Sequence, residues 1–248
     1  MDETPHFEFE LAPDATLGSH LLIGFASPGM SSLVATDHLT TELDASEVGH
    51  ATAHGLATVT PFTDGKPRYA TRLYDSGEDL SLLVSEVFLP AAVGELLGDA
   101  VVTLANQHGV DEITLLYGAS YPHGPEQHAV FSVSTDAYPT DRLDDHGVEP
   151  LSGGFLDGLV GSLLDRGIDD ETPAVGTLVT PGHPPGPDFD AALLLLDAVC
   201  AHYNIEVDRA ELEERSEEIH RYYAELADRM EAVQDEGSRD WLDDRMYM

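Results

Sequence analysis

Short apolar runs alternate with longer amphipathic segments along residues 7–200, and this alternation restricts the fold more than any other feature. The run HLLIGFA at 20–26 is apolar at nearly every position, which is typical of a strand covered on both faces. Pro28-Gly29 breaks this run, and residues 30–43 then have helical character. A buried strand, a tight turn and a helix in this order predict an α/β unit.

The same alternation continues to the end of the apolar part of the chain. Further strand-like runs occupy 7–11, 68–74, 80–87, 112–117, 129–134 and 174–180, and helical patterns occupy 90–108, 155–164 and 188–200. The sequence therefore predicts a core domain over 1–205, an α/β sandwich built around a largely parallel or mixed sheet.

From Asp208 the chain becomes strongly helical and charged, and we predict a long acidic helix over 206–235. Acidic residues precede arginines by four positions at 211/215, 217/221 and 225/229, which favours a helix. Apolar residues recur with coiled-coil spacing at Leu212, Ile219, Tyr223, Leu226, Met230 and Val233. This stripe can pair with another copy of the chain or pack on its own domain.

The final segment, 236–248, is polar and contains Gly237, so we predict a flexible tether. It ends in Met246-Tyr247-Met248, a hydrophobic residue, a tyrosine and any residue at a free terminus. The terminal carboxylate can pair with a cation or a backbone nest, while the ring and the first methionine fill pockets. The tripeptide resembles the tail by which proteasome activators and assembly chaperones dock between subunits of the proteasome core particle. Alone it is short enough to arise by chance.

The formal net charge is -36, from 47 acidic and 11 basic residues spread along the chain. This composition predicts adaptation to high salt, with a basic partner as the alternative. The sequence has no stripe of basic residues that could bind the phosphates of a nucleic acid, so nucleic-acid binding is not expected. No apolar stretch of membrane-spanning length occurs, and the start of the chain is acidic, so we predict a cytoplasmic protein without a membrane segment.

Five motifs carry a resemblance to a known family. In chain order they are GFASPGM (24–30), LLYGAS (115–120), GGFLDGLVGSLL (153–164), VGTLVT (175–180) and PGPDFDAALLLLDAV (185–199). Their succession resembles the archaeal and bacterial branch of the proteasome assembly chaperone family, over about residues 21–230. Within that family, the acidic composition indicates a haloarchaeal member.

The resemblance implies a three-layer α/β/α sandwich similar to that of nucleoside phosphorylases, and assembly as a homo-oligomer. It also implies a non-enzymatic role without a cofactor, in which the C-terminal residues Met246, Tyr247 and Met248 bind α-subunits of the proteasome core particle. Bacterial relatives often lack such a tail, so the domain alone does not identify the function.

The segment around the first turn is a candidate ligand loop, formed by Gly24, Phe25, Ser27, Pro28 and Gly29. A loop between a strand and a helix N-terminus favours an anion, as in phosphorylase-like folds. The adjoining residues offer no arginine to hold a phosphate, so a structural turn is the simpler interpretation. A phosphorylase- or nucleosidase-like enzyme and a small-ligand-binding oligomer are the alternatives.

No pattern of catalytic residues is found, and no residue is predicted to be catalytic. His123 and His128 flank Gly124-Pro125 in a predicted surface loop, without an HExxH motif or a second cluster nearby in sequence. We therefore predict no metal site.

Overall fold

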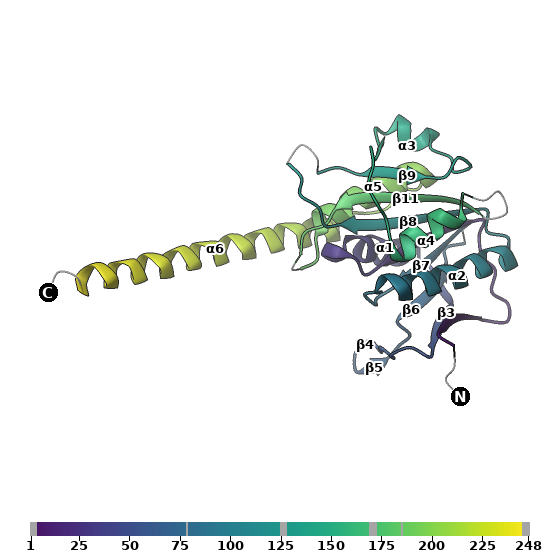
Figure 1. Cartoon of the computed structure of the whole chain (residues 1–248), viewed down its shortest axis with the longest axis horizontal. Coiled ribbons are helices and arrows are strands. Elements are labelled where there is room, and N and C mark those ends of the chain that lie inside the picture. Colours follow the sequence, from purple (N-terminus) through teal and green to yellow (C-terminus); the bar gives the residue numbers. More distant parts are fainter. Residues whose placement is uncertain (1–3, 78, 125–127, 169–172, 185, 245–248) are drawn as a thin grey trace. The chain divides into compact units, whose positions relative to one another are not determined.

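The apolar run at 20–26 forms β2 (His20–Phe25), an inner strand of a mixed sheet. Figure 1 labels most of the other strands of this sheet. The computed structural model describes residues 4–77, 79–124, 128–168, 173–184 and 186–244. The chain divides into two units, Met1–Asp208 and Arg209–Met248. The sequence places this boundary after residue 205.

Within the described residues, nine strands form the main sheet. In order across the sheet they are β1 (His6–Leu11), β3 (Ser46–His54), β6 (Thr71–Asp75), β7 (Leu80–Ser85), β2, β8 (Glu112–Ala119), β11 (Ala174–Pro181), β9 (Phe131–Ser134) and β10 (Glu149–Pro150). The four inner strands β7, β2, β8 and β11 are parallel. Their carboxyl ends therefore share one edge of the sheet. A small hairpin, β4 (Phe62–Thr63) with β5 (Lys66–Pro67), stands apart from this sheet.

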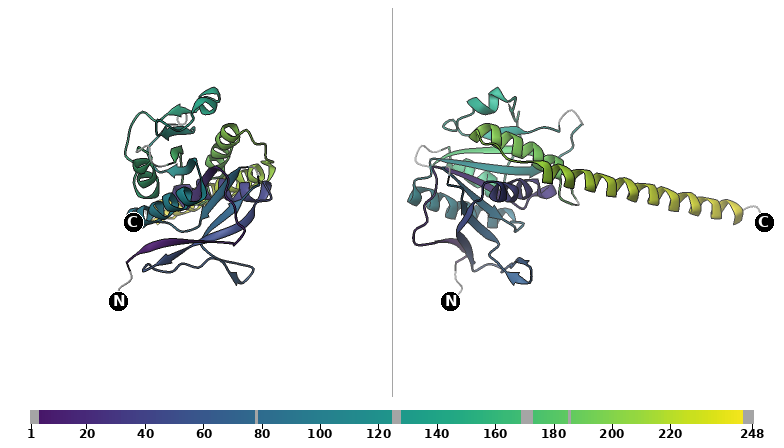
Figure 2. Two further views of the ribbon diagram at one scale, coloured as in Figure 1. Left: turned by 90° about the vertical axis from the view of Figure 1, so that its right-hand side faces the viewer. Right: turned by 180° about the vertical axis from the view of Figure 1, so that it is seen from behind.

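Helices cover both faces of the sheet (Figure 2). The helices of the first unit are η1 (Pro28–Met30), α1 (Ser31–Glu42), α2 (Ala91–His108), α3 (Asp141–Asp145), α4 (Gly158–Arg166) and α5 (Phe189–Tyr203). Leu21, Ile23 and Phe25 belong to the core cluster that includes α2 and α4. Gly24 faces the other side, where a Cβ atom would lie 2.0 Å from the hydroxyl of Thr36 in α1. Side chains of β2 thus point alternately to the two faces of the sheet. The pair α2 and α4 covers one face, and the pair α1 and α5 covers the other.

Local sequence signals set several helix ends. Asp188 caps α5 by accepting a hydrogen bond from the Ala191 backbone N–H at 3.0 Å. Gly109 ends α2 with a φ of 73°, a left-handed conformation that glycine adopts without strain. Both ends agree with the sequence prediction.

Several elements differ from the sequence prediction, and three of the differences are informative. β3 was not predicted, because in SEVGHATAH only Ala51 is buried and backbone pairing to β1 and β6 holds the strand. α4 begins at Gly158 instead of residue 155, after an extended Asp157. The single helix of the second unit, α6, spans Ala210–Asp244 and so includes residues 236–244, where the sequence predicts a tether. One glycine costs a helix only about 1 kcal/mol, so Gly237 is compatible with a continuous helix.

Candidate functional site

Three of the loops that begin at the carboxyl edge of the parallel strands form the candidate site, and ligands bind at this edge in open α/β sheets. β2 ends at Phe25, β8 at Ala119 and β11 at Pro181. The loop after β2 contains Ser27, Pro28 and Gly29, three of the five residues of the predicted ligand loop.

The other two residues of that prediction lie in β2 itself. Phe25 stacks on Tyr117 with ring centroids 5.9 Å apart, on the α2 and α4 side of the sheet. Gly24 faces α1 on the opposite side. The structure therefore does not bring all five residues to one surface, and binding at the remaining three stays a prediction.

Backbone from β8 and from the residue after β11 packs closely on the turn after β2. A Cβ atom at Gly118 would lie 2.5 Å from the Pro28 carbonyl oxygen, and one at Gly182 would lie 2.3 Å from the same atom. The Gly118 N–H also donates a hydrogen bond to the Ser27 hydroxyl at 3.2 Å. Gly29 has a φ of 73°, which a residue with a side chain rarely adopts. The glycines thus permit a close approach of three backbone segments at this turn.

The loops after β8 and β11 bring three histidines together beside this turn. His123 and His128 follow β8, and His183 follows β11. One ring nitrogen from each lies within 4.8 Å of the others. The Nε2 atoms of His123 and His183 are 3.2 Å apart. Burial lowers the pKa of His128, and the neighbouring His183 and His123 rings lower it further against the opposing effect of Asp188.

Asp188 orients one ring of this histidine cluster. Its carboxylate accepts hydrogen bonds from the His183 ring Nδ1 at 2.6 Å and from the His183 backbone N–H at 3.0 Å. The Asp188 backbone N–H donates to the Gly29 carbonyl at 2.7 Å. The cluster is therefore tied directly to the turn after β2.

The sequence did not predict this cluster, because His183 lies 60 positions from His123 and is similarly remote in sequence from any local motif that includes His128. One feature of the predicted fold could have indicated that these loops meet. Both loops follow adjacent parallel strands, so their first residues meet at the same edge.

A concavity of about 1040 Å³ opens beside the carboxyl ends of β8 and β11. Its lining includes Tyr117, Val133 and Val179 from the sheet, and Phe155 and Ile168 from flanking loops. Phe155 is fully exposed and Ile168 is 73% exposed. The wall is mostly apolar, so it suits an apolar or aromatic group better than a phosphate.

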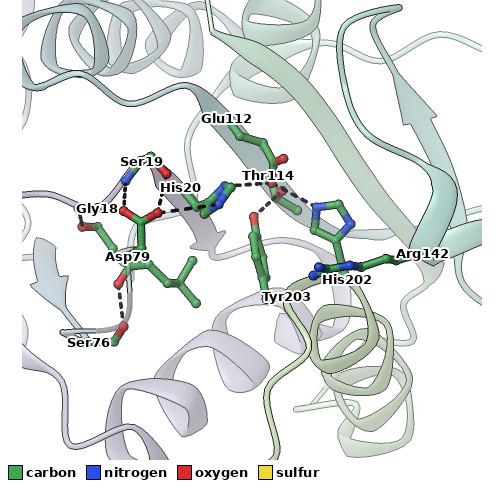
Figure 3. A network of polar contacts seen from close by, with 12 residues as sticks. Gly18, Ser19, His20, Ser76, Asp79, Glu112, Thr114, Arg142, His202 and Tyr203 are labelled. Atoms are coloured by element: carbon green, nitrogen blue, oxygen red, sulfur yellow. Dashed lines mark hydrogen bonds and ion pairs between the residues drawn. The ribbon is translucent and has the colours of Figure 1, made fainter.

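A buried polar network lies near the amino ends of the same strands (Figure 3). The Glu112 carboxylate is 3.0 Å from His202 Nε2, and each residue is 5% exposed. The Tyr138 hydroxyl bonds to the same nitrogen at 3.0 Å and to the Thr114 hydroxyl at 2.7 Å. Tyr203 donates to Thr114 at 2.6 Å. These bonds connect β8 to α5.

The network continues to the protein surface through His20. Its Nδ1 lies 3.5 Å from the Glu112 carboxylate, and its Nε2 lies 4.0 Å from Asp79. Hydrogen bonds from the Ser19 hydroxyl and backbone N–H lower the pKa of Asp79. Desolvation raises the pKa of Glu112, but hydrogen bonding and charge from His202 outweigh it and hold the net pKa below its usual value.

The C-terminal residues Met246, Tyr247 and Met248 lie outside the described residues. Among the helices that are described, none combines the length and the apolar character of a membrane span.

Comparison with known proteins decides the family. The sequence profile of the PAC2 family matches residues 21–227. The chain belongs to the PAC2 family. This result confirms the resemblance to proteasome assembly chaperones, while the haloarchaeal origin stays an expectation. No curated protein matches the chain.

Several solved structures have the same fold. Pyrococcus furiosus PbaA, an archaeal homolog of proteasome-assembly chaperone, aligns with a TM-score of 0.78 at 18% identity, over 97% of this chain and 100% of its own. Pyrococcus furiosus PbaB, an archaeal proteasome activator, aligns with a TM-score of 0.75 at 18% identity, over 90% and 99%. A Thermoplasma acidophilum protein of unknown function aligns with a TM-score of 0.72 at 22% identity, over 91% and 93%. At these identities the similarity establishes the fold.

Proposed function

We propose that this PAC2 protein binds the proteasome core particle as a non-enzymatic assembly chaperone or activator. Family membership carries the proposal. Two structural relatives from Pyrococcus furiosus support it, one a homolog of proteasome-assembly chaperone and the other a proteasome activator. The hydrophobic-tyrosine-any tripeptide at 246–248 adds a sequence feature suited to docking.

In this proposal the tripeptide enters pockets between α-subunits of the core particle. Met246 fills an apolar niche, the Tyr247 ring and hydroxyl provide a second anchor, and the Met248 carboxylate pairs with a cation. The helix before it, α6, has 35 residues and is therefore about 52 Å long. It can hold the tripeptide far from its own first residue, Ala210.

We further propose that the protein is a homo-oligomer. Tyr223, Leu226 and Met230 of α6 are exposed apolar side chains on the stripe with coiled-coil spacing. Association through this stripe would remove them from water. Several tails on one oligomer would then share an effective concentration, so weak single tails could bind with high avidity.

Co-purification with the proteasome core particle or its α-subunits tests the docking proposal. The assay is run in molar KCl, because a net charge of -36 favours folding where charges are screened. The intact chain should bind, and removal of residues 246–248, Tyr247→Ala or one added C-terminal residue should each abolish binding. Tyr222→Ala is the matched control, because Tyr222 is a 60% exposed tyrosine on α6 outside the apolar stripe. Binding that survives all three tail changes would refute docking.

One observation favours a second candidate, a small ligand at Ser27–Gly29. The Ser31 hydroxyl next to this turn is buried and has no hydrogen-bond partner among the described residues. Thermal unfolding with phosphate and with nucleosides tests it, since a ligand that binds the folded state raises the melting temperature. Nucleoside cleavage that depends on phosphate would identify a phosphorylase-like enzyme. Unchanged unfolding and no cleavage would exclude this candidate for these ligands.

A further inference from the structure

We propose that His123, His128 and His183 form a binding site for a divalent transition-metal cation of the Zn²⁺ class. The three residues lie in two loops that follow the adjacent parallel strands β8 and β11. This site is independent of the C-terminal tail and adds a metal to a protein for which the sequence predicts none.

Hydrogen bonds fix which nitrogen is available on two of the rings. His123 Nδ1 lies 2.9 Å from the Tyr121 carbonyl oxygen, which can only accept, so this nitrogen carries the proton. His183 Nδ1 lies 2.6 Å from the Asp188 carboxylate and carries the proton for the same reason. In the neutral rings both Nε2 atoms then have free lone pairs.

These two lone pairs face each other at short range. The Nε2 atoms are 3.2 Å apart. Two nitrogens bound to one tetrahedral Zn²⁺ at about 2.05 Å are separated by about 3.3 Å. The observed separation is therefore close to that of two ligands of one ion, whereas two unprotonated nitrogens at this distance repel each other. A cation or a shared proton must lie between them.

His128 supplies the third ligand, and its position favours a cation over a shared proton between the His123 and His183 rings. Its Nε2 is buried and has no hydrogen-bond partner within the described part of the chain. The His128 ring centroid lies 5.2 Å from that of His183 and 5.8 Å from that of His123. The three ligand nitrogens are at most 4.8 Å apart, and coordination would draw the wider pairs to about 3.3 Å.

Asp188 is a positioning residue for this site. A carboxylate that accepts from the second nitrogen of a ligating histidine fixes the ring and increases its basicity. The same carboxylate is itself held, because its second oxygen caps α5 through the Ala191 N–H at 3.0 Å. A bound ion would thus join the loop after β8 to the start of α5.

The ligand set selects the class of metal. The three proposed ligands are all imidazoles, and none is a carboxylate. Such a set suits Zn²⁺ or a neighbouring transition metal, whereas Ca²⁺ and Mg²⁺ prefer oxygen ligands. Three protein ligands leave a fourth position for water or another small ligand, and the His183 side chain is 53% exposed toward solvent.

Metal titration of the full chain tests the proposal. A second group, in which His6 and Glu8 are exposed and His54 is half-buried, lies on β1 and β3, so the His6→Ala variant serves as the background. In this background, chelator-treated protein is titrated with ZnCl₂ by calorimetry, and the bound metal is counted by elemental analysis. We expect one Zn²⁺ per chain and a higher melting temperature. Co²⁺ should give the intense visible absorption of a four-coordinate ion.

Variants separate this site from adventitious binding. His128→Ala and His183→Ala should each weaken zinc binding more than tenfold and remove the thermal shift. Asp188→Asn leaves one acceptor oxygen in place of two. When this oxygen caps α5, the amide NH₂ group faces the His183 Nδ1–H and cannot accept from it, so zinc binding should weaken by about 10- to 100-fold. His108→Ala, a change to an exposed histidine at the end of α2, should bind zinc unchanged. The proposal would be overturned if the His6→Ala background bound no zinc, or if His128→Ala and His183→Ala bound zinc as tightly as that background. Either result would leave a shared proton between the rings.

Discussion

The buried network around Glu112 makes a quantitative prediction about stability. The change is Glu112→Gln, which preserves the shape of the side chain and removes its charge. Glu112 and His202 are each 5% exposed, and the carboxylate lies 3.0 Å from the His202 ring and 3.5 Å from that of His20. Hydrogen bonds to charged groups contribute about 1.5–3 kcal/mol, and glutamine retains part of this as a neutral acceptor. We expect the free energy of unfolding to fall by about 1.5 kcal/mol near neutral pH.

The pH dependence follows from the lowered pKa of Glu112. A carboxyl group with a lower pKa in the folded state stabilises the fold above its unfolded value, and this contribution disappears as the pH falls through the folded value. The usual value is 4.5 and the folded value lies below it. The difference between wild type and Glu112→Gln should therefore be constant above about pH 5.5 and shrink toward zero in acid below the usual value.

Urea unfolding of both proteins between neutral pH and pH 3 measures this difference. Taking the difference cancels the general effect of net charge, which both proteins share apart from one unit. Glu149→Gln is the matched control, because Glu149 is exposed on β10, and it should change stability by less than about 0.5 kcal/mol. The Glu112 effect should also persist in molar KCl, since buried pairs are poorly screened. A difference that is absent at neutral pH, or that does not shrink in acid, would refute the reasoning.

Three further changes test other parts of the structure. Gly118→Ala places a Cβ atom 2.5 Å from a backbone oxygen of the turn after β2 and should cost about 1–3 kcal/mol in urea unfolding, whereas Gly124→Ala, with open space around it, should be nearly neutral. Glu86→Ala removes the carboxylate that pairs with Arg72, which is 7% exposed, and should cost about 3 kcal/mol. A loss below about 0.5 kcal/mol would show that the arginine finds another partner. Leu226→Glu places a charge on the exposed stripe of α6 and should reduce the oligomer mass measured by light scattering without loss of helix signal; an unchanged mass would place the oligomer contact elsewhere.

The sequence predicted most of the core elements because the inner strands are short, continuously buried runs and the helices carry end signals. β2 and β11 are apolar at nearly every position, and α2 and α5 carry recognisable end signals at Gly109 and Asp188. β3 escaped prediction because long-range backbone pairing holds it, and pairing leaves little trace in side-chain pattern. The short β10 and α3 are also too brief to produce a periodic signal.

The candidate site was only partly predictable. The turn after β2 was located from Pro28-Gly29 and the strand before it. The packing of Gly118 and Gly182 on this turn depends on which strands are neighbours, which a single sequence does not specify. The same holds for the meeting of His183 with His123, because the contact joins positions 60 residues apart.

The first strand of the sheet has a consequence for how copies of the chain can associate. β1 pairs with β3 on one side and forms one end of the described sheet, so its other side presents unpaired backbone groups. Its sequence HFEFEL turns Phe7, Phe9 and Leu11 toward the core and Glu8 and Glu10 outward. Antiparallel addition of a second β1 would bring these carboxylates close together.

At ordinary pH this repulsion opposes edge-to-edge pairing of two copies of β1. Protonation in acid, or dense screening by salt, removes that repulsion. In concentrated salt this edge would therefore lose the charge repulsion that opposes its pairing with a second copy of β1.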